Sequence, residues 1–377
     1  MTRVLELSAQ AAGGVRAHIR QVSQLLAKDG HQVLLAGPSN VISPAPDAVS
    51  GACLRTYQID IGARPSGADL KALRQLKQLA VTVEVIHAHG LRAGALAVLA
   101  AKRLPAAKRP RVVVTLHNLP VGSAPTRLVG KALHLVVVKG ADYVLTVSPD
   151  LLEKAKQLGL EAGEIAVVPA PARGCADYGC MDRATQPEIS QASAQSSDAS
   201  SDTDCDAAPC LLTIARLAPQ KGLDLLLEAA TLIKQRGIDF TWLVAGDGPL
   251  KAQLNQQIAA AALPVKLLGR REDIGALLFQ ADVVVQTSYW EGQPLTLREA
   301  MQAGRAIVAT DVGGSAYTLA GCGQLVEPQA GPLADAVVAV ISDPKRRETL
   351  EAASRAAVAK IPGETQLREQ LDRVLAL

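Results

Sequence analysis

The feature that most constrains the fold is an alternation of short apolar runs with helical stretches, which recurs in both halves of the chain. Continuous apolar strands separated by helices of about 10–15 residues are typical of parallel sheets covered on both faces. The pattern therefore predicts an α/β protein with two Rossmann-like, doubly wound domains whose parallel sheets face each other across a cleft. The predicted strands are Val4–Leu7, Val33–Ala36, Val85–Ala88, Val112–Leu116, Tyr143–Val147, Ile165–Val168, Leu211–Ala215, Thr241–Ala245, Val265–Leu268 and Val283–Gln286.

An acidic segment separates the two halves. Cys175–Cys210 contains seven acidic residues and one basic residue, and Gln191–Asp206 within it has no Leu, Ile, Val or Phe. Such a segment cannot bury enough apolar surface to offset the entropy lost on ordering. We expect an N-terminal domain over residues 1–172, a disordered linker over 173–208, a C-terminal domain over 209–360, and a terminal helix over 361–377 that can pack back on the N-terminal domain.

The composition narrows the classes of function. Lys and Arg (39) exceed Asp and Glu (36) by only three, and two Phe, two Trp and five Tyr are too few to suggest base-stacking platforms for nucleic acid. Met1–Leu7 runs directly into a strand without the regions of a signal peptide. The apolar stretches Ala93–Ala101 and Leu133–Val138 are far shorter than the ~20 residues that span a bilayer. We predict a cytoplasmic protein.

Three clusters of glycine or polar residues lie at predicted ends of strands, where ligands of parallel α/β domains bind. Gly13 and Gly14 open a helix, so that backbone N–H groups there could approach an anion. Arg216 and Lys221 flank the start of another helix, and two fixed cations at such a place could hold a diphosphate. His117 ends an apolar strand. Each cluster has a structural alternative: a simple turn, solvated surface charges, and a structural histidine.

A fourth cluster lies in Ser288–Gly304. Pro294 suits a first helical turn, which places Glu291 in the preceding loop and Glu299 in the helix. A structural alternative treats Glu291 as a partner of the helix dipole and Glu299 as a surface charge, although Glu299 has apolar neighbours in the sequence. The backbone N–H groups that we expect to point at the cleft are those of Gly292, Gln293 and Leu295.

Together these clusters resemble the GT-B glycosyltransferases of the large retaining group called family 4, or glycosyltransferase group 1. The resemblance covers nearly the whole chain outside the acidic segment, and Glu291 and Glu299 have the family's separation of seven intervening residues. The other matching stretches are Gly13–Val15, Gly30–Val33, Ala141–Val144, Val147–Ser148, Arg216, Lys221–Gly222, Gly246–Leu250 and Gly304–Gly314.

The resemblance implies a hexosyltransferase-like enzyme that moves a sugar from a nucleotide-diphosphate donor to an acceptor hydroxyl with retention of the anomeric configuration. The leaving phosphate would itself take the acceptor's proton on the same face of the sugar. Glu291 and His117 would face the transferred sugar, and no protein-bound metal or other cofactor is expected. The donor-binding residues implied by the resemblance are Gly13, Gly14, Arg216 and Lys221 for the diphosphate, Gly269 and Arg270 for the base, Glu299 for the ribose, and Gly292, Gln293, Pro294 and Leu295 for the sugar and phosphate.

The chain departs from the family pattern at two places. No carboxylate follows Gly313–Gly314, and Gln293 stands where an aromatic residue is common. These departures leave the identity of the donor open. The presence of Arg216, Lys221 and both glutamates favours a transferase over an inactive sugar-nucleotide-binding protein, and a nucleotide-sugar epimerase or hydrolase on the same fold is the alternative enzyme.

Several possible metal ligands have weaker contexts. The Asp-x-Asp matches within Asp202–Asp206 lack a preceding strand, so we interpret them as chance matches. His87 and His89 would bind a metal only together with a carboxylate, and none is adjacent in the sequence. For the pairs Cys175/Cys180 and Cys205/Cys210, zinc binding and a linker disulfide are alternatives to unpaired thiols.

A basic segment precedes the predicted strand Val112–Leu116. It is interpreted either as a solvated loop or as a surface for peripheral docking on the inner face of an anionic membrane, where lipid-linked acceptors reside. Its cations are Lys102, Arg103, Lys108, Arg109 and Arg111.

Overall fold

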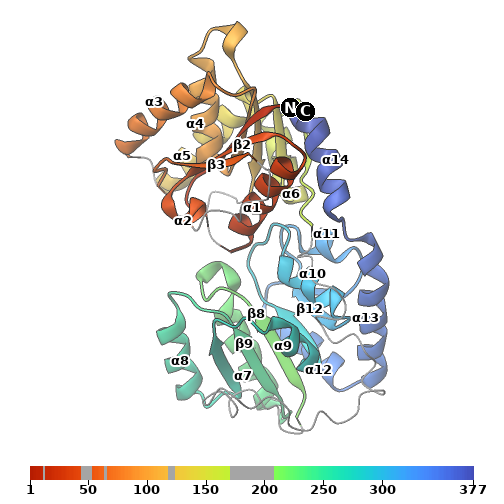
Figure 1. Cartoon of the computed structure of the whole chain (residues 1–377). Coiled ribbons are helices and arrows are strands. Elements are labelled where there is room, and N and C mark those ends of the chain that lie inside the picture. Colours follow the sequence, from red (N-terminus) through yellow and green to blue (C-terminus); the bar gives the residue numbers. More distant parts are fainter. Residues whose placement is uncertain (12, 44–52, 63–65, 118–123, 170–207) are drawn as a thin grey trace, which may run out of the picture. The chain divides into compact units, whose positions relative to one another are not determined.

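The computed structural model describes residues 1–11, 13–43, 53–62, 66–117, 124–169 and 208–377 (Figure 1). The chain divides into two compact units, Met1–Pro169 with Pro362–Leu377, and Ala170–Ile361. Residues 173–207 of the predicted linker lie outside the described residues, and so do Cys175, Cys180 and Cys205 within it.

The first unit contains one parallel sheet of seven strands in the order β3-β2-β1-β4-β5-β6-β7. Its inner strands are mainly apolar, and all five side chains of β4 are buried although two of them are histidines. The order reverses between β1 and β4, so their carboxyl ends form the switch point at which such sheets bind ligands. The strands are β1 (Arg3–Ser8), β2 (Gln32–Gly37), β3 (Leu54–Gln58), β4 (Val85–His89), β5 (Arg111–Leu116), β6 (Tyr143–Thr146) and β7 (Gly163–Ile165).

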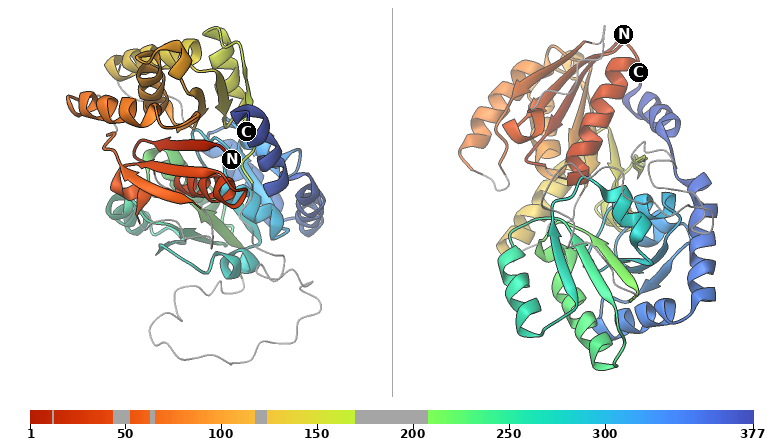
Figure 2. Two further views of the ribbon diagram at one scale, coloured as in Figure 1. Left: turned by 45° about the horizontal axis from the view of Figure 1, so that its top comes forward. Right: turned by 60° about the horizontal axis from the view of Figure 1, so that its bottom comes forward.

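Helices from both ends of the chain complete the first unit. Gln370 on the last helix accepts a hydrogen bond from the Val167 N–H at 2.7 Å, and Arg368 pairs with Asp29 at 2.7 Å. The two ends of the chain therefore lie side by side (Figures 1 and 2). The helices are α1 (Gly13–Lys28), α2 (Ser39–Ile42), α3 (Ala68–Ala80), α4 (Leu91–Lys102), η1 (Ala106–Lys108), α5 (Ala124–Gly140), α6 (Pro149–Gln157) and α14 (Glu364–Leu375).

The second unit contains a parallel sheet of six strands in the order β10-β9-β8-β11-β12-β13. Aliphatic layers cover it on both faces: residues of α7 and α12 join one core cluster, and residues of α9 and α10 join the other. The strands are β8 (Cys210–Ile214), β9 (Thr241–Ala245), β10 (Val265–Gly269), β11 (Val283–Gln286), β12 (Ala306–Thr310) and β13 (Gln324–Val326). The helices are η3 (Pro219–Lys221), α7 (Leu223–Gln235), α8 (Lys251–Ala260), α9 (Ile274–Gln280), α10 (Leu295–Gln302), α11 (Ser315–Leu319), α12 (Ala330–Ile341), α13 (Pro344–Ala357) and η4 (Val358–Lys360).

The predicted class, two Rossmann-like α/β domains with doubly wound parallel sheets, is confirmed, but the strand predictions differ from the structure at four places. The strand expected at Ile165–Val168 ends at Ile165, and β3, β12 and β13 were not expected. The strands β3 and β13 lie at sheet edges, and four of the five side chains of β3 are exposed, so neither has a buried apolar run. By contrast, β12 is an inner strand with five buried side chains, and its apolar run was overlooked. Among the described helices, none is long and apolar enough to cross a membrane.

Cys210, the last residue of the acidic segment, lies within the second unit. It is the first residue of β8, its side chain is buried in a core cluster, and its N–H donates to the Asp282 carboxylate at 2.8 Å. Cys210 is therefore a buried residue of the sheet, while the suggested pairing partner Cys205 lies outside the described residues.

Candidate active site

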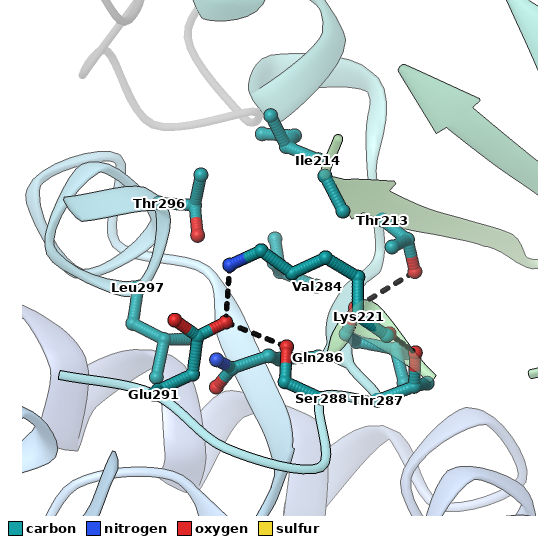
Figure 3. Close-up of a pocket in the computed structure, with 12 residues that line it drawn as sticks. Thr213, Ile214, Lys221, Val284, Gln286, Thr287, Ser288, Glu291, Thr296 and Leu297 are labelled. Atoms are coloured by element: carbon teal, nitrogen blue, oxygen red, sulfur yellow. Dashed lines mark hydrogen bonds and ion pairs between the residues drawn. The ribbon is translucent and has the colours of Figure 1, made fainter. Parts of the chain in front are cut away.

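A pocket opens at the carboxyl edge of the second unit's sheet (Figure 3). Its walls are the ends of β8 and β11, which are neighbours across the point where the strand order reverses, and the first turn of α10. Side chains from the β8–α7 and β11–α10 connections also contribute to its lining, among them Lys221, Ser288 and Glu291. The pocket therefore lies at the switch point where doubly wound sheets bind ligands.

Lys221 and Glu291 form the charged centre of this pocket. The Lys221 Nζ lies 2.5 Å from the Glu291 Oε1, and the Ser288 hydroxyl donates to the same oxygen at 2.6 Å. Figure 3 shows the two side chains reaching toward each other from opposite walls. The Glu291 side chain is 8% exposed and that of Lys221 26%, so a cation is held at a fixed position with partial access to solvent.

Two glycines bring the backbone segments of this pair close to their neighbours. Gly222 has φ +59°, and a Cβ there would lie 2.0 Å from the Thr287 carbonyl oxygen. Gly313 has φ +53°, and a Cβ there would lie 2.0 Å from the Glu291 carbonyl oxygen. That oxygen also accepts a hydrogen bond from the Gly314 N–H at 2.9 Å. Only glycine combines these backbone angles with such close approaches, so both positions fix the loops that carry Lys221 and Glu291.

Helix α10 begins at the pocket. It starts at Leu295 after Pro294, and no side chain caps its first turn. The N-terminus of a helix carries partial positive charge and free N–H groups, both of which favour an anionic ligand. The Gln293 side chain, by contrast, has a structural role that the sequence did not predict: its Oε1 accepts from Arg298 at 2.5 Å, and both residues are buried. Burial lowers the pKa of Arg298 to about 10.

Most of the predicted donor-binding residues of this unit do not line the pocket. Of the unit's predicted residues within the part of the chain that the structure describes, only Lys221 and Glu291 line it; those that do not are Arg216, Gly269, Arg270, Gly292, Gln293, Pro294, Leu295 and Glu299. Arg216 is exposed in the loop after β8, and this loop is fixed by the hydrogen bond from the Leu217 N–H to the Asp247 carbonyl. Glu299 is half-buried on α10, Gly269 ends β10, and Arg270 is exposed.

In the first unit, the predicted residues lie at the carboxyl ends of strands. Gly13 and Gly14 are exposed at the start of α1, and Gly13 has φ +56°. His117 directly follows β5 and is only 6% exposed. Its Nε2 lies 3.2 Å from the His89 Nδ1 at the end of β4, which makes it one member of a buried histidine cluster.

His87 and His89 have no adjacent carboxylate in the sequence, but the fold supplies one. Glu6 of β1 pairs in register with His87, and its two oxygens contact the two histidines, at 3.1 Å from the His87 Nδ1 and 2.7 Å from the His89 Nε2. All three side chains are almost completely buried. The signal was available in the sequence, because Glu6 is the one charged residue within the apolar run Val4–Leu7.

Burial and proximity shift the pKa values in this cluster. Burial alone would raise the pKa of Glu6, but His87 and His89 outweigh it and hold this pKa at about 2. Burial and the neighbouring His87 lower the pKa of His89 to about 4. Burial, with the neighbouring His89, His18 and His87, lowers the pKa of His117 well below its ordinary value. At neutral pH the cluster therefore contains an ionised carboxylate beside neutral imidazoles of His89 and His117.

The chemistry of this donor set is compatible with a divalent cation, since one ligand atom each from Glu6, His87 and His89 lies within 4.8 Å of the others. These atoms also face each other directly at hydrogen-bond distances. A cation would have to replace both hydrogen bonds, so the geometry itself is that of a hydrogen-bonded cluster.

The basic segment of the first unit is partly engaged with its own backbone. Arg109 donates to the Leu104 carbonyl at 2.9 Å, and Arg111 donates to the Val374 carbonyl at the same distance. Lys102 and Lys108 are exposed. Part of this positive charge thus ties loops and α14 together.

Comparisons with known proteins agree with this arrangement. A family model described as glycosyl transferase 4-like domain matches residues 13–171, and one described as glycosyl transferases group 1 matches residues 208–343. The phosphatidyl-myo-inositol mannosyltransferase of Mycobacterium tuberculosis is 29% identical over 364 residues, which cover 92% of this chain and 88% of that protein. The alpha-D-kanosaminyltransferase of Streptomyces kanamyceticus is 33% identical over 152 residues, and this match spans only 38% of the chain and 39% of that relative.

A solved structure gives the same fold. The crystal structure of Anabaena Alr3699/HepE in complex with UDP-glucose is similar to this chain with a TM-score of 0.74 at 19% identity, and the match covers 100% of both chains. The two family models together match most of both units and leave out most of the acidic segment and residues 344–377. The chain therefore belongs to the group 1, family 4 glycosyltransferases and has their GT-B fold, as the order and spacing of its motifs predicted.

Proposed function

We propose that the protein transfers a sugar from a nucleotide-diphosphate donor to an acceptor hydroxyl and retains the anomeric configuration. The observation that carries this proposal is the Lys221–Glu291 pair, held at the switch point of the second unit beside the uncapped start of α10. A fixed ammonium and the N-terminus of a helix together favour a diphosphate. A carboxylate at the same place favours a sugar that becomes positively charged.

In the reaction that we propose, the bond from the anomeric carbon to the diphosphate oxygen breaks as the bond to the acceptor oxygen forms on the same face. The leaving phosphate takes the acceptor's proton. Lys221, with Arg216 from the neighbouring loop, would stabilise the charge that grows on the diphosphate. Preorganised groups aimed at developing charge commonly contribute more to catalysis than any other single effect. Glu291 would favour the positive character of the sugar in the transition state.

The comparisons support the classes of donor and acceptor that we propose. One structural neighbour was crystallised with UDP-glucose, so a nucleoside-diphosphate hexose is the donor class to test first. One relative is named for a phosphatidyl-myo-inositol acceptor, which supports a lipid-linked acceptor as one option. For such an acceptor, Lys102 and Lys108 on the exposed basic segment could contact an anionic membrane surface on its cytoplasmic side. The absence of a required metal stays a prediction.

Donor binding can be tested by thermal shift with UDP-, GDP- and ADP-linked hexoses. A donor at 100 times its dissociation constant stabilises a protein by about 2.7 kcal/mol, which gives a measurable shift in Tm. We expect one nucleotide class to stabilise the wild type and to stabilise Lys221→Ala much less. Lys345→Ala, on α13, removes a lysine of the same unit away from the pocket and is the matched control. Equal stabilisation of all three proteins would contradict the assignment of the pocket.

A further inference from the structure

His117 is the end of a continuous chain of hydrogen-bonding groups that crosses the interior of the first unit. The Thr115 Oγ1 lies 2.8 Å from the His87 Nε2, and the His87 Nδ1 lies 3.1 Å from one oxygen of Glu6. The other oxygen of Glu6 lies 2.7 Å from the His89 Nε2. The His89 Nδ1 then lies 3.2 Å from the His117 Nε2. None of these five side chains is more than 6% exposed.

The ionised Glu6 carboxylate determines which atom donates and which accepts in each hydrogen bond between Glu6 and His117. An ionised carboxylate only accepts, so the His89 Nε2 must carry the hydrogen that it donates to Glu6. A neutral imidazole has one N–H, which leaves the His89 Nδ1 as an acceptor. The His117 Nε2 must therefore donate to it, and the one remaining ring nitrogen, the His117 Nδ1, keeps a lone pair.

We infer that Glu6, acting through His89, fixes His117 in the tautomer whose Nδ1 accepts a hydrogen bond. The pKa of about 2 for Glu6 and of about 4 for His89 supports the protonation states that this polarity requires. His18 of α1 packs its ring edge-on against those of His89 and His117, with centroids 6.1 and 5.9 Å away, and so restricts their rotation. Glu6 and His89 are thus positioning residues, because they act on a ligand only through His117.

This polarity defines what His117 can recognise. A lone pair pairs with a hydroxyl, which donates, and not with an ionised phosphate oxygen, which only accepts. This step rests on the proposed function and on the family resemblance, which implies that His117 faces the transferred sugar. The structure then assigns His117 to a sugar hydroxyl and leaves the diphosphate to the cations of the second unit. Loss of Glu6 should therefore change selectivity for that hydroxyl.

The positions of the ring hydrogens on His89 and His117 can be measured directly on the free wild-type protein with ¹⁵N-labelled imidazoles. Long-range ¹H–¹⁵N correlation at pH 7 should show His117 and His89 both protonated at Nε2 and bare at Nδ1. A His117 protonated at Nδ1, or a His89 protonated at both nitrogens, would overturn the inference. So would one equivalent of a metal in the purified protein by elemental analysis, because the three groups would then be ligands. His134→Gln, on α5 outside the cluster, should leave these signals unchanged.

The variant Glu6→Gln tests whether the Glu6 carboxylate determines the tautomer of His117. In Glu6→Gln the amide can donate to the His89 Nε2, which a carboxylate cannot do, so a population of His117 protonated at Nδ1 should appear. An unchanged His117 tautomer in this variant would overturn the role of Glu6. The wild-type measurement decides the polarity even if this variant does not fold.

Turnover then separates positioning from a merely structural role. Wild type and Glu6→Gln are compared for kcat/KM with the preferred donor and with its monodeoxy analogues. For one hydroxyl, the preference of the wild type over the deoxy donor should fall by about tenfold in Glu6→Gln. Equal losses for every donor would overturn the selectivity step. If no donor is turned over by the wild type, the proposed function fails, while the tautomer measurement stands independently.

Discussion

The buried Glu6–His89 pair predicts a loss of stability in mild acid that is confined to the first unit. The pKa of His89 is about 4 in the folded protein and about 6.5 in an unfolded chain. Between these values the unfolded state binds the proton and the folded state does not, so stability falls as the pH falls through this interval. The linkage relation gives a loss of roughly 2 kcal/mol between pH 7 and pH 5 from His89 alone. Glu6, whose pKa is lowered from 4.5 to about 2, adds a second loss only below about pH 4.5.

Urea unfolding at pH 7, 6 and 5 measures this dependence. Circular dichroism follows both units, whereas the two tryptophans, Trp242 and Trp290, both belong to the second unit and report on it alone. We expect the dichroism midpoint of the first unit to fall with pH and the fluorescence midpoint to change much less. His89→Gln should flatten the dependence by roughly the 2 kcal/mol assigned to His89. His31→Gln, a half-buried histidine of the same unit outside the cluster, should retain it.

A slope in His89→Gln as steep as that of the wild type would refute the reasoning, whatever the absolute stability of the variant. A parallel fall of the tryptophan signal would also refute it, because the titrating group would then lie in the second unit.

Four further substitutions test the candidate site of the second unit. Lys221→Ala removes a charge-assisted contact worth about 1.5–3 kcal/mol and should lower kcat/KM at least tenfold with an unchanged urea midpoint of the fluorescence transition; wild-type kinetics would exclude its role at the diphosphate. Glu291→Gln should lower kcat more than it raises the donor KM, while Glu299→Gln should mainly raise the donor KM. Steady-state kinetics with varied donor measures both constants, and the opposite pattern would mean that the two roles are reversed. Gly222→Ala forces a Cβ to 2.0 Å from the Thr287 carbonyl and should destabilise the second unit by about 1–3 kcal/mol; an unchanged urea midpoint would show that the loop relaxes freely.

Most of the central strands could be predicted because they have a local signal, although the apolar run of β12 was overlooked. Apolar runs such as Val283–Gln286 are buried on both faces, and β11 has these bounds. The meeting of Lys221 with Glu291 followed from the family pattern, since 70 positions in the sequence separate them and no local rule brings them together. The edge strand β3 has mainly exposed polar residues and lacked such a signal.

The sequence could indicate that Glu6 has buried partners but not which residues these partners are, because that depends on the register between strands. Glu6 and His87 are 81 positions apart, and only the parallel pairing of β1 with β4 places them side by side. Within one strand, His87 and His89 share a face because side chains alternate with a period of two. A charged residue within a buried apolar run is costly unless it is paired, so Glu6 was the position from which to suspect a partner.

The central claim is tested most directly by the stereochemistry of transfer. The wild type is incubated with the donor class selected by thermal shift and with a panel of free and lipid-linked acceptor hydroxyls, and ¹H NMR identifies the anomeric configuration of the product. The account predicts release of the nucleoside diphosphate together with a glycoside of the donor's own anomeric configuration, and strong reduction of both in Glu291→Gln. A product of inverted configuration, or full activity in Glu291→Gln, would contradict it.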